Sequence, residues 1–89
     1  MNLIPINVQV FCYYDGENVD MKGTFLLDNK KVHIDACANS SSRGSGTYLN
    51  YELVEDDMLE AALTDLMADI VEKVGKDNFS VEFKDGQLV

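Results

Sequence analysis

The chain has 89 residues, which is enough for one domain with a small core and leaves no room for a second. A formal net charge of −9 disfavours direct binding to nucleic acid or to an anionic membrane, because the phosphate groups would be repelled. The hydrophobic fraction of 46% is typical of a folded protein, and no apolar run reaches the ~20 residues that span a bilayer. The start of the chain lacks the basic and apolar blocks of a signal peptide, which predicts a cytoplasmic protein.

Three alternating segments open the chain and predict an antiparallel meander joined by short turns. The first is 2–14, where Pro5 fits a strand only near its start or at a sheet edge. The segments 19–27 and 31–37 alternate in the same way. Gly23 falls on the inward side of the second segment, where it indicates either a bulge or room for a helix. In the first segment the side chains expected to face the core are Ile4, Ile6, Val8, Val10, Cys12 and Tyr14.

Two further strands are predicted beyond the meander. The segment 38–46 holds only small and polar residues and predicts a mobile loop with Arg43 at its tip. The segment 47–54 alternates weakly and is interpreted as a fourth strand. The segment 79–83 alternates large apolar with polar residues and predicts a short final strand.

The segment between Asp57 and Gly75 predicts the one long helix. Asp57 is the expected N-cap, Glu60 completes a pair like a capping box, and Gly75 is expected to close the last turn. We expect Leu63 and Leu66 to be almost fully buried against the sheet. Apolar side chains recur at steps of three and four residues and define the buried stripe: Leu59, Ala62, Leu63, Leu66, Met67, Ile70 and Val74.

The predicted order β-β-β-β-α-β defines an α+β fold in a single domain that spans residues 1–89. We expect an antiparallel sheet of four to five strands with the helix packed on one face. The other face is expected to be open to water, as antiparallel sheets allow.

His33, Asp35 and Cys37 alternate on the third strand and would project from one face. A histidine, a carboxylate and a thiol can bind zinc or activate a nucleophile, but both need further groups that the sequence does not supply. Exposure to solvent explains the alternation equally well. We therefore predict no catalytic residue, no metal site and no cofactor, and we expect Cys12 and Cys37 to be free thiols.

A run of eight carboxylates with no Lys or Arg among them is the most unusual feature of the sequence. It is called the acidic ridge below and consists of Glu52, Glu55, Asp56, Asp57, Glu60, Asp65, Asp69 and Glu72. Lys73 and Lys76 can pair with Asp69 and Glu72 at i+4. A charged outer face is usually just solvated, yet concentrated like charge costs stability and can serve to attract a basic partner.

Phe11 and Tyr13 fall on the side of the first strand opposite its apolar set. An exposed aromatic pair on a sheet face is typical of a contact surface, because aromatic rings bury much area at low entropic cost. The alternative is that a bulge or another segment covers them. The sequence leaves both interpretations open.

A small, acidic α+β chain without a catalytic motif resembles the inhibitors that phages produce against host defences, namely anti-CRISPR proteins and DNA mimics. The resemblance rests on size, charge and the absence of a motif over the whole chain. It implies a non-enzymatic protein of the host-cell cytoplasm that blocks a basic, nucleic-acid-binding surface of a host protein. Within the resemblance, carboxylates stand where phosphates would lie and aromatic side chains act as anchors. The residues expected to contact the partner are Glu52, Asp56, Asp57, Glu60, Asp65, Asp69, Glu72, Phe11, Tyr13, Tyr48 and Arg43.

The second interpretation is an immunity protein, or a small module that forms a homodimer through the open sheet face. Acidic immunity proteins also block basic nucleases, so charge alone does not separate the two interpretations.

Overall fold

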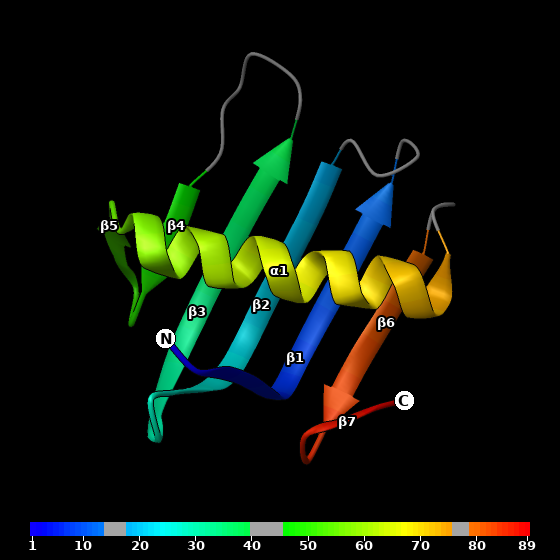
Figure 1. Ribbon diagram of the computed structural model, residues 1–89, viewed down its shortest axis with the longest axis horizontal. Coiled ribbons are helices and arrows are strands. Elements are labelled where there is room, and N and C mark those ends of the chain that lie inside the picture. Colours follow the sequence, from blue (N-terminus) through cyan, green and yellow to red (C-terminus); the bar gives the residue numbers. More distant parts are fainter. Residues whose placement is uncertain (14–17, 40–45, 76–78) are drawn as a thin grey trace.

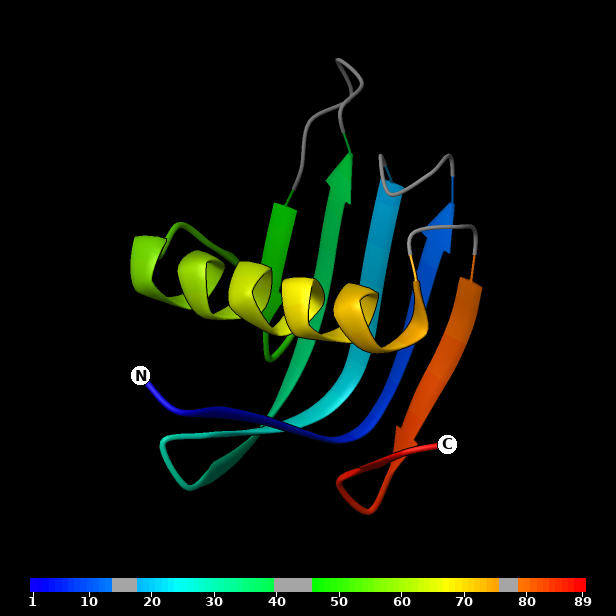
Figure 2. The same ribbon diagram turned by 45° about the vertical axis from the view of Figure 1, so that its right-hand side comes forward.

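The computed structural model describes residues 1–13, 18–39, 46–75 and 79–89. Within these ranges it forms one seven-stranded antiparallel sheet with a single helix lying across one face (Figures 1 and 2). The strand order across the sheet is β5-β4-β3-β2-β1-β6-β7. The elements are β1 (Leu3–Tyr13), β2 (Asn18–Leu27), β3 (Lys30–Asn39), β4 (Gly46–Leu49), β5 (Glu52–Val54), α1 (Asp57–Val74), β6 (Phe79–Lys84) and β7 (Gln87–Leu88).

The α+β prediction is confirmed. The sheet has seven strands and not the predicted four to five, because two segments each form a hairpin where one strand was expected. The segment 47–54 is a hairpin, since Asn50 and Tyr51 reverse the chain between β4 and β5. The end of the chain adds β7 beside β6. Strand β3 reaches Asn39 and β4 begins at Gly46, so the predicted loop keeps only 40–45, which lie outside the described residues.

Three tight turns in the described chain have two central residues with positive φ, which is the type I′ conformation that suits the twist of a hairpin. Residues that tolerate positive φ, namely Asp, Asn and Gly, occupy five of the six central positions of these turns. The pairs are Asp28 (φ 49°) and Asn29 (φ 69°), Asn50 (φ 50°) and Tyr51 (φ 69°), and Asp85 (φ 51°) and Gly86 (φ 83°).

A bulge near the start of β1 changes which side chains face the helix. The register with β2 shifts between Pro5 and Asn7, so Pro5 is paired with Phe25 and is buried. The prediction that Ile4 faces the core is therefore wrong: Ile4 is 38% exposed, because the extra residue in β1 inverts the alternation before it. Beyond the bulge, Val8 and Val10 face inward as expected.

Gly23 lies opposite this bulge and allows β1 and β2 to approach closely. A Cβ at this position would overlap the carbonyl oxygen of Asn7 and would lie 2.8 Å from the Cα atom of Val8. The φ of Gly23 is +148°, which side chains rarely allow. The glycine is therefore required by the backbone of β1, and the room it makes is for a neighbouring strand.

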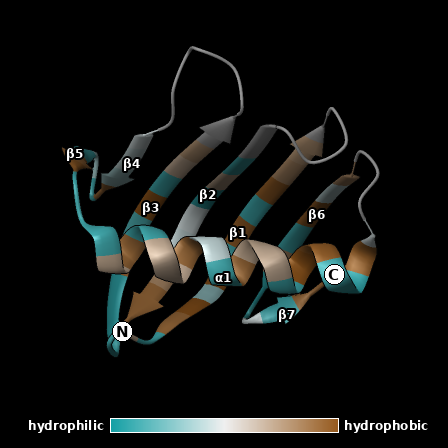
Figure 3. Ribbon diagram, turned by 45° about the horizontal axis from the view of Figure 1, so that its top comes forward, coloured by the Kyte–Doolittle hydropathy of each residue, from teal (hydrophilic) through white to brown (hydrophobic). Residues whose placement is uncertain are grey.

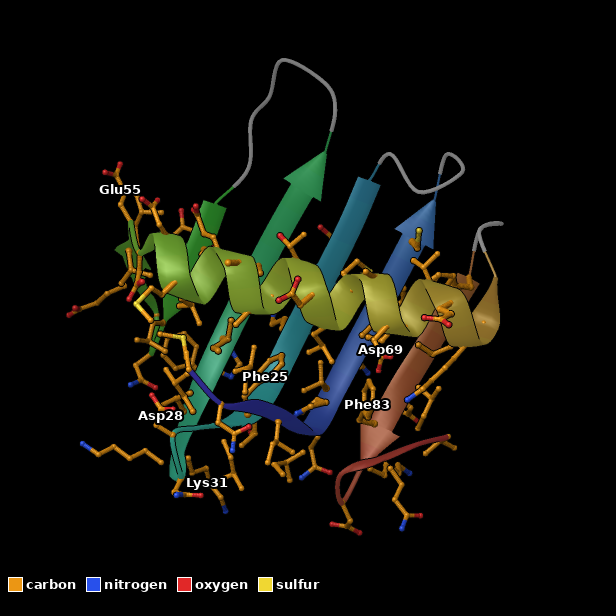
Figure 4. The ribbon with its side chains drawn as sticks, in the orientation of Figure 1. Phe25, Asp28, Lys31, Glu55, Asp69 and Phe83 are labelled. Carbon is orange, nitrogen blue, oxygen red and sulfur yellow. The ribbon has the colours of Figure 1, made fainter. Side chains whose placement is uncertain are left out.

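The hydrophobic core lies between α1 and the sheet, and Figure 4 shows Phe25 on β2 beneath the helix. The prediction that Leu66 is almost fully buried is wrong, because Leu66 is only partly buried while Leu63 is 5% exposed. At 100° per residue, Leu66 lies about 40° to one side of the line through the fully buried helix positions. The fully buried core comprises Val8, Val10, Met21, Phe25, Ile34, Leu59, Leu63 and Ile70.

The helix begins at Asp57, as predicted, but the predicted N-cap is wrong by one residue. Asp56, not Asp57, is the N-cap, and its carboxylate accepts hydrogen bonds from the backbone N–H groups of Met58 and Leu59 at 3.0 and 3.1 Å. Glu60 is then too far along to complete a capping box. Gly75 ends the helix with φ 97° and ψ 178°, a conformation open almost only to glycine, and its N–H donates to the carbonyl of Val71.

The helix α1 is not long and apolar enough to cross a membrane, and the described chain has no other helix.

Candidate protein-binding surface

The outer side of α1 carries five exposed carboxylates of the acidic ridge. The helix spans the sheet from the β5 side to the β6 side (Figure 1), so these charges follow one another along the helix axis and spread over the half of the helix that faces away from the core. From Asp57 to Glu72 they extend over about 22 Å of the axis, or one charge per ~5–6 Å, at 1.5 Å per helical residue. One strand of duplex DNA carries one charge per ~3.4 Å. The five residues are Asp57, Glu60, Asp65, Asp69 and Glu72.

The acidic ridge is densest where the chain passes from β5 into α1. Glu52, Glu55 and Asp56 are all exposed there and lie next to the first turn of the helix. Figure 4 shows Glu55 pointing away from the molecule, and Figure 3 shows the hydrophilic stretch that leads into α1. The partial positive charge at a helix N-terminus favours carboxylates at this place. Of these three, only Asp56 has its side chain engaged by the capping hydrogen bonds.

Among the described residues, the positive charge near the acidic ridge is at the C-terminal end of α1. The Nζ atom of Lys73 lies 3.2 Å from Oδ2 of Asp69, and both side chains are more than half exposed. Such a surface pair contributes about 0–1 kcal/mol to stability. Lys76, the other predicted partner, lies outside the described residues. The negative field of the ridge is therefore strongest at the N-terminal end of α1.

The predicted aromatic anchors lie on the opposite side of the sheet from the acidic ridge. Phe11 and Tyr48 are 42% and 44% exposed on the face that the helix leaves open. The side chain of Tyr13 and all of Arg43 lie outside the described residues. The predicted contact residues therefore form two surfaces in different layers, which meet only around the edge formed by β5.

Two exposed residues at that edge were not anticipated from the sequence. Tyr51 is 77% exposed and Leu53 is 61% exposed, although a single strand over 47–54 would have turned both toward the core. The hairpin turn reverses them, and Leu53 becomes the cross-strand partner of Tyr48. Tyr48, Tyr51 and Leu53 are called the apolar corner below. The sequence signal was Asn50, a residue that favours tight turns.

Tyr51 is held firmly despite its exposure. Its ring stacks on that of His33, with centroids 4.5 Å apart and planes inclined by 12°. The turn is fixed to β3 by two hydrogen bonds: the Asn50 N–H donates to the His33 carbonyl at 2.7 Å, and the His33 N–H donates to Oδ1 of Asn50 at 3.0 Å.

The same turn carries two local costs. A residue other than glycine at φ 69° costs of order 1 kcal/mol. The Nε2 atom of His33 is buried without a hydrogen-bond partner, a further cost of about 1–3 kcal/mol.

His33, Asp35 and Cys37 do share one face of β3, as the alternation predicted, but their arrangement is poor for catalysis. Among the described residues no group of three His, Cys, Asp or Glu side chains is placed to hold a metal ion. His33 lines a shallow hollow of about 320 Å³ that neither Asp35 nor Cys37 lines. Cys12 is buried, Cys37 is exposed, and the two are not joined by a disulfide bond.

Cys37 is held in its protonated form. A hydrogen bond to Asp20 on β2, together with partial burial and the charges of Asp20 and Asp35, raises the pKa of Cys37 from 9.0 to about 11. A nucleophilic cysteine needs the opposite shift, since the thiolate is the reactive form.

We expect exposed Cys37 to react with iodoacetamide about 100-fold more slowly at pH 8 than an unstructured cysteine, because a pKa two units higher leaves about 100-fold less thiolate. The rate should continue to rise up to about pH 11. Replacing Asp20 with Asn removes the charge and should speed the reaction. The measurement is mass spectrometry of Cys37 alkylation against pH, and an ordinary rate at pH 8 would contradict the expectation.

No protein-family model, curated protein or solved structure matches the chain, so the function has to be inferred from the chain's own geometry.

Proposed function

We propose that this protein is a non-enzymatic inhibitor that binds a basic, nucleic-acid-binding surface of another protein, in the manner of anti-CRISPR proteins and DNA mimics. The observation that carries the proposal is the acidic ridge, whose five helical carboxylates are exposed over the half of α1 that faces away from the core. Within the described part of the chain, Lys73 makes the one ion pair with it. Its place of action is the cytoplasm of a host cell.

In the proposed mechanism the protein competes with nucleic acid for the partner's groove by electrostatic attraction and by steric exclusion. A concentration of carboxylates raises the local attraction for a positively charged groove and speeds the encounter. Once bound, the helix and the sheet beneath it occupy the space that nucleic acid would fill. The ridge has roughly 0.6 of the linear charge density of one DNA strand, so electrostatics has to be assisted by shape and by apolar contacts.

The state of Cys37 supports a function without catalysis, because its thiol is protonated at neutral pH. The charge of the protein supports a protein partner and not nucleic acid itself.

A competition experiment tests the proposal. The tagged protein is used to capture a partner from a lysate of the host cell, and the purified partner is then titrated with DNA in the presence of the protein. We expect the captured partner to bind DNA and to release it as the protein is added. A partner that binds DNA and this protein at the same time, without mutual displacement, would contradict the proposal.

The second candidate is an immunity protein or a small module that forms a homodimer through the open sheet face. The exposure of Phe11 and Tyr48 on that uncovered face favours it. Sedimentation of the purified protein separates the two candidates, since the homodimer requires self-association that depends on Phe11.

A further inference from the structure

The apolar corner is a compact exposed surface where the open face meets the edge of the sheet. Tyr48 and Leu53 are paired across β4 and β5, and both side chains lie against Gly46. A Cβ at Gly46 would be 3.6 Å from Cε1 of Tyr48 and 3.8 Å from Cδ1 of Leu53. Tyr51 lies in the turn between the two strands. The corner thus gathers three large, exposed side chains within six residues of chain.

The conformation of Tyr51 is not explained by the stability of the turn. The other two turns of the same type have Asn29 and Gly86 at the second position, which are residues suited to positive φ. Tyr51 has φ 69° at that position and gains little burial in exchange, since it is 77% exposed. The stack on His33 offsets part of this cost, and backbone strain at an exposed position is typical of functional positions.

The corner is rigid as well as exposed, which lowers the entropic cost of binding. Stacking on His33 fixes the ring of Tyr51, and the two hydrogen bonds of Asn50 fix the turn. Tyrosine is enriched among the residues that dominate binding energy, because it buries a large area and has few rotatable bonds. A rigid, exposed tyrosine beside a leucine therefore suits an anchor that enters an apolar pocket.

The charges around the corner determine what can bind there. Asp35 is the neighbour of Tyr48 across the open face, and Lys22 on its other side makes no ion pair with it among the described residues. Glu55 follows Leu53 by two residues at the same edge, whereas Glu52 pairs with Leu49 and belongs to the helix-covered face. A second copy of this chain would bring a net charge of −9 against these carboxylates, and nucleic acid would bring phosphates.

We propose that the apolar corner is a docking site for a protein segment that has an apolar side chain flanked by Lys or Arg. The inference rests on the proposed function for the basic character of the partner, and it adds the anchor that the acidic ridge lacks. The apolar side chains enter the interface core, and Asp35 and Glu55 meet the basic residues at its rim. The corner and the densest part of the ridge adjoin at β5, so one partner can contact both.

Selection from a random peptide library tests the proposal and does not require the partner to be identified first. Peptides displayed on phage are selected on the immobilised wild-type protein, and the consensus peptide is synthesised and titrated by fluorescence polarisation. We expect the consensus to combine an aromatic or aliphatic residue with at least two Lys or Arg. Tyr51→Gly and Leu53→Ser should each weaken its binding about tenfold or more, since both remove an anchor.

The matched control is Val89→Ala, which shortens an apolar side chain that is 71% exposed beside β6, on the opposite side of the sheet from β5 and in none of the proposed binding surfaces. It should change the affinity of the peptide by less than about twofold, as expected for a residue outside the contact. Tyr51→Gly should also keep or raise the melting temperature, because glycine suits the turn. A clear fall in melting temperature would show a structural role and overturn the assignment of Tyr51 as an anchor.

Other outcomes would overturn the proposal as a whole. One is a selected consensus without basic residues, and another is a peptide affinity that neither Tyr51→Gly nor Leu53→Ser changes. A third is self-association of the wild-type protein that Tyr51→Gly abolishes. The proposed function can fail separately. If reversing the charges of the ridge leaves partner binding unchanged while Tyr51→Gly weakens it, the proposed function of the acidic ridge is contradicted and the docking site at the apolar corner is supported. If charge reversal weakens binding and Tyr51→Gly does not, the function of the ridge is supported and the docking site is contradicted.

Discussion

Gly23→Ala is expected to destabilise the protein by about 3 kcal/mol or more, a large share of the 5–15 kcal/mol that typical domains possess. The new Cβ would overlap the carbonyl oxygen of Asn7 and crowd the Cα of Val8. Both are backbone atoms of β1, so the clash cannot be relieved by a side-chain rotation. Relief requires β1 to move away from β2, which breaks hydrogen bonds at the centre of the sheet. Urea unfolding followed by far-ultraviolet circular dichroism measures the effect.

Gly46→Ala is the matched control. A Cβ at Gly46 would meet only the ends of the Tyr48 and Leu53 side chains, at ordinary contact distances of 3.6 and 3.8 Å. We expect its unfolding midpoint to stay near that of the wild type. If Gly23→Ala unfolds at the same urea concentration as Gly46→Ala, then the close approach of β1 and β2 is not a constraint on the fold.

Reversing Asp57, Asp65 and Asp69 to Lys is expected to slow association with a basic partner about tenfold or more at low salt. Each reversal adds two positive charges, so the net charge changes from −9 to −3. Long-range attraction acts mainly on the association rate and is screened beyond ~8 Å at physiological salt. The difference between the variant and the wild type should therefore shrink as salt is added. Stopped-flow or surface-based kinetics with the captured partner at two salt concentrations provides the measurement.

The fold should tolerate this triple change, because all three side chains are exposed on α1. Relief of repulsion along the ridge is offset by the loss of the Asp69–Lys73 pair, and each effect is a few tenths of a kcal/mol. The control reverses Asp28, Glu82 and Asp85 to Lys, which gives the same net charge away from both the helix and the apolar corner. Equal slowing by the two variants would assign the effect to net charge alone and not to the acidic ridge.

The helix and its exposed charges could be predicted from the sequence because both follow from periodicity alone. Leu59, Leu63 and Ile70 repeat at helical spacing, and the carboxylates between them fall on the other side whatever the helix packs against. The hairpin at Asn50 and Tyr51 could not be predicted in the same way. Its second residue is a tyrosine where Asn or Gly is the recognisable signal, and the alternation continues through the turn.

The bulge in β1 escaped prediction for a different reason. Nothing in the sequence around Ile6 marks an extra residue, because a bulge is defined by the register with a neighbouring strand. Gly23, the residue that permits it, lies on that neighbour. The split of the candidate site into two layers, by contrast, follows from the alternation of the first strand, because Phe11 falls opposite the apolar set that the helix covers.

The position of β1 in the sheet has a consequence for how the chain folds. β1 lies between β2, which follows it directly, and β6, which comes from near the other end of the chain, and Val10 pairs with Val81. Until β6 has left the ribosome, one edge of β1 stays unpaired, with Val8 and Val10 beside it. Pairing across so much of the chain is slow, and an open apolar edge invites aggregation. The strong negative charge slows the association of such incomplete chains but does not prevent it. A chain that ends before β6 would keep this edge permanently, so we expect such fragments to aggregate.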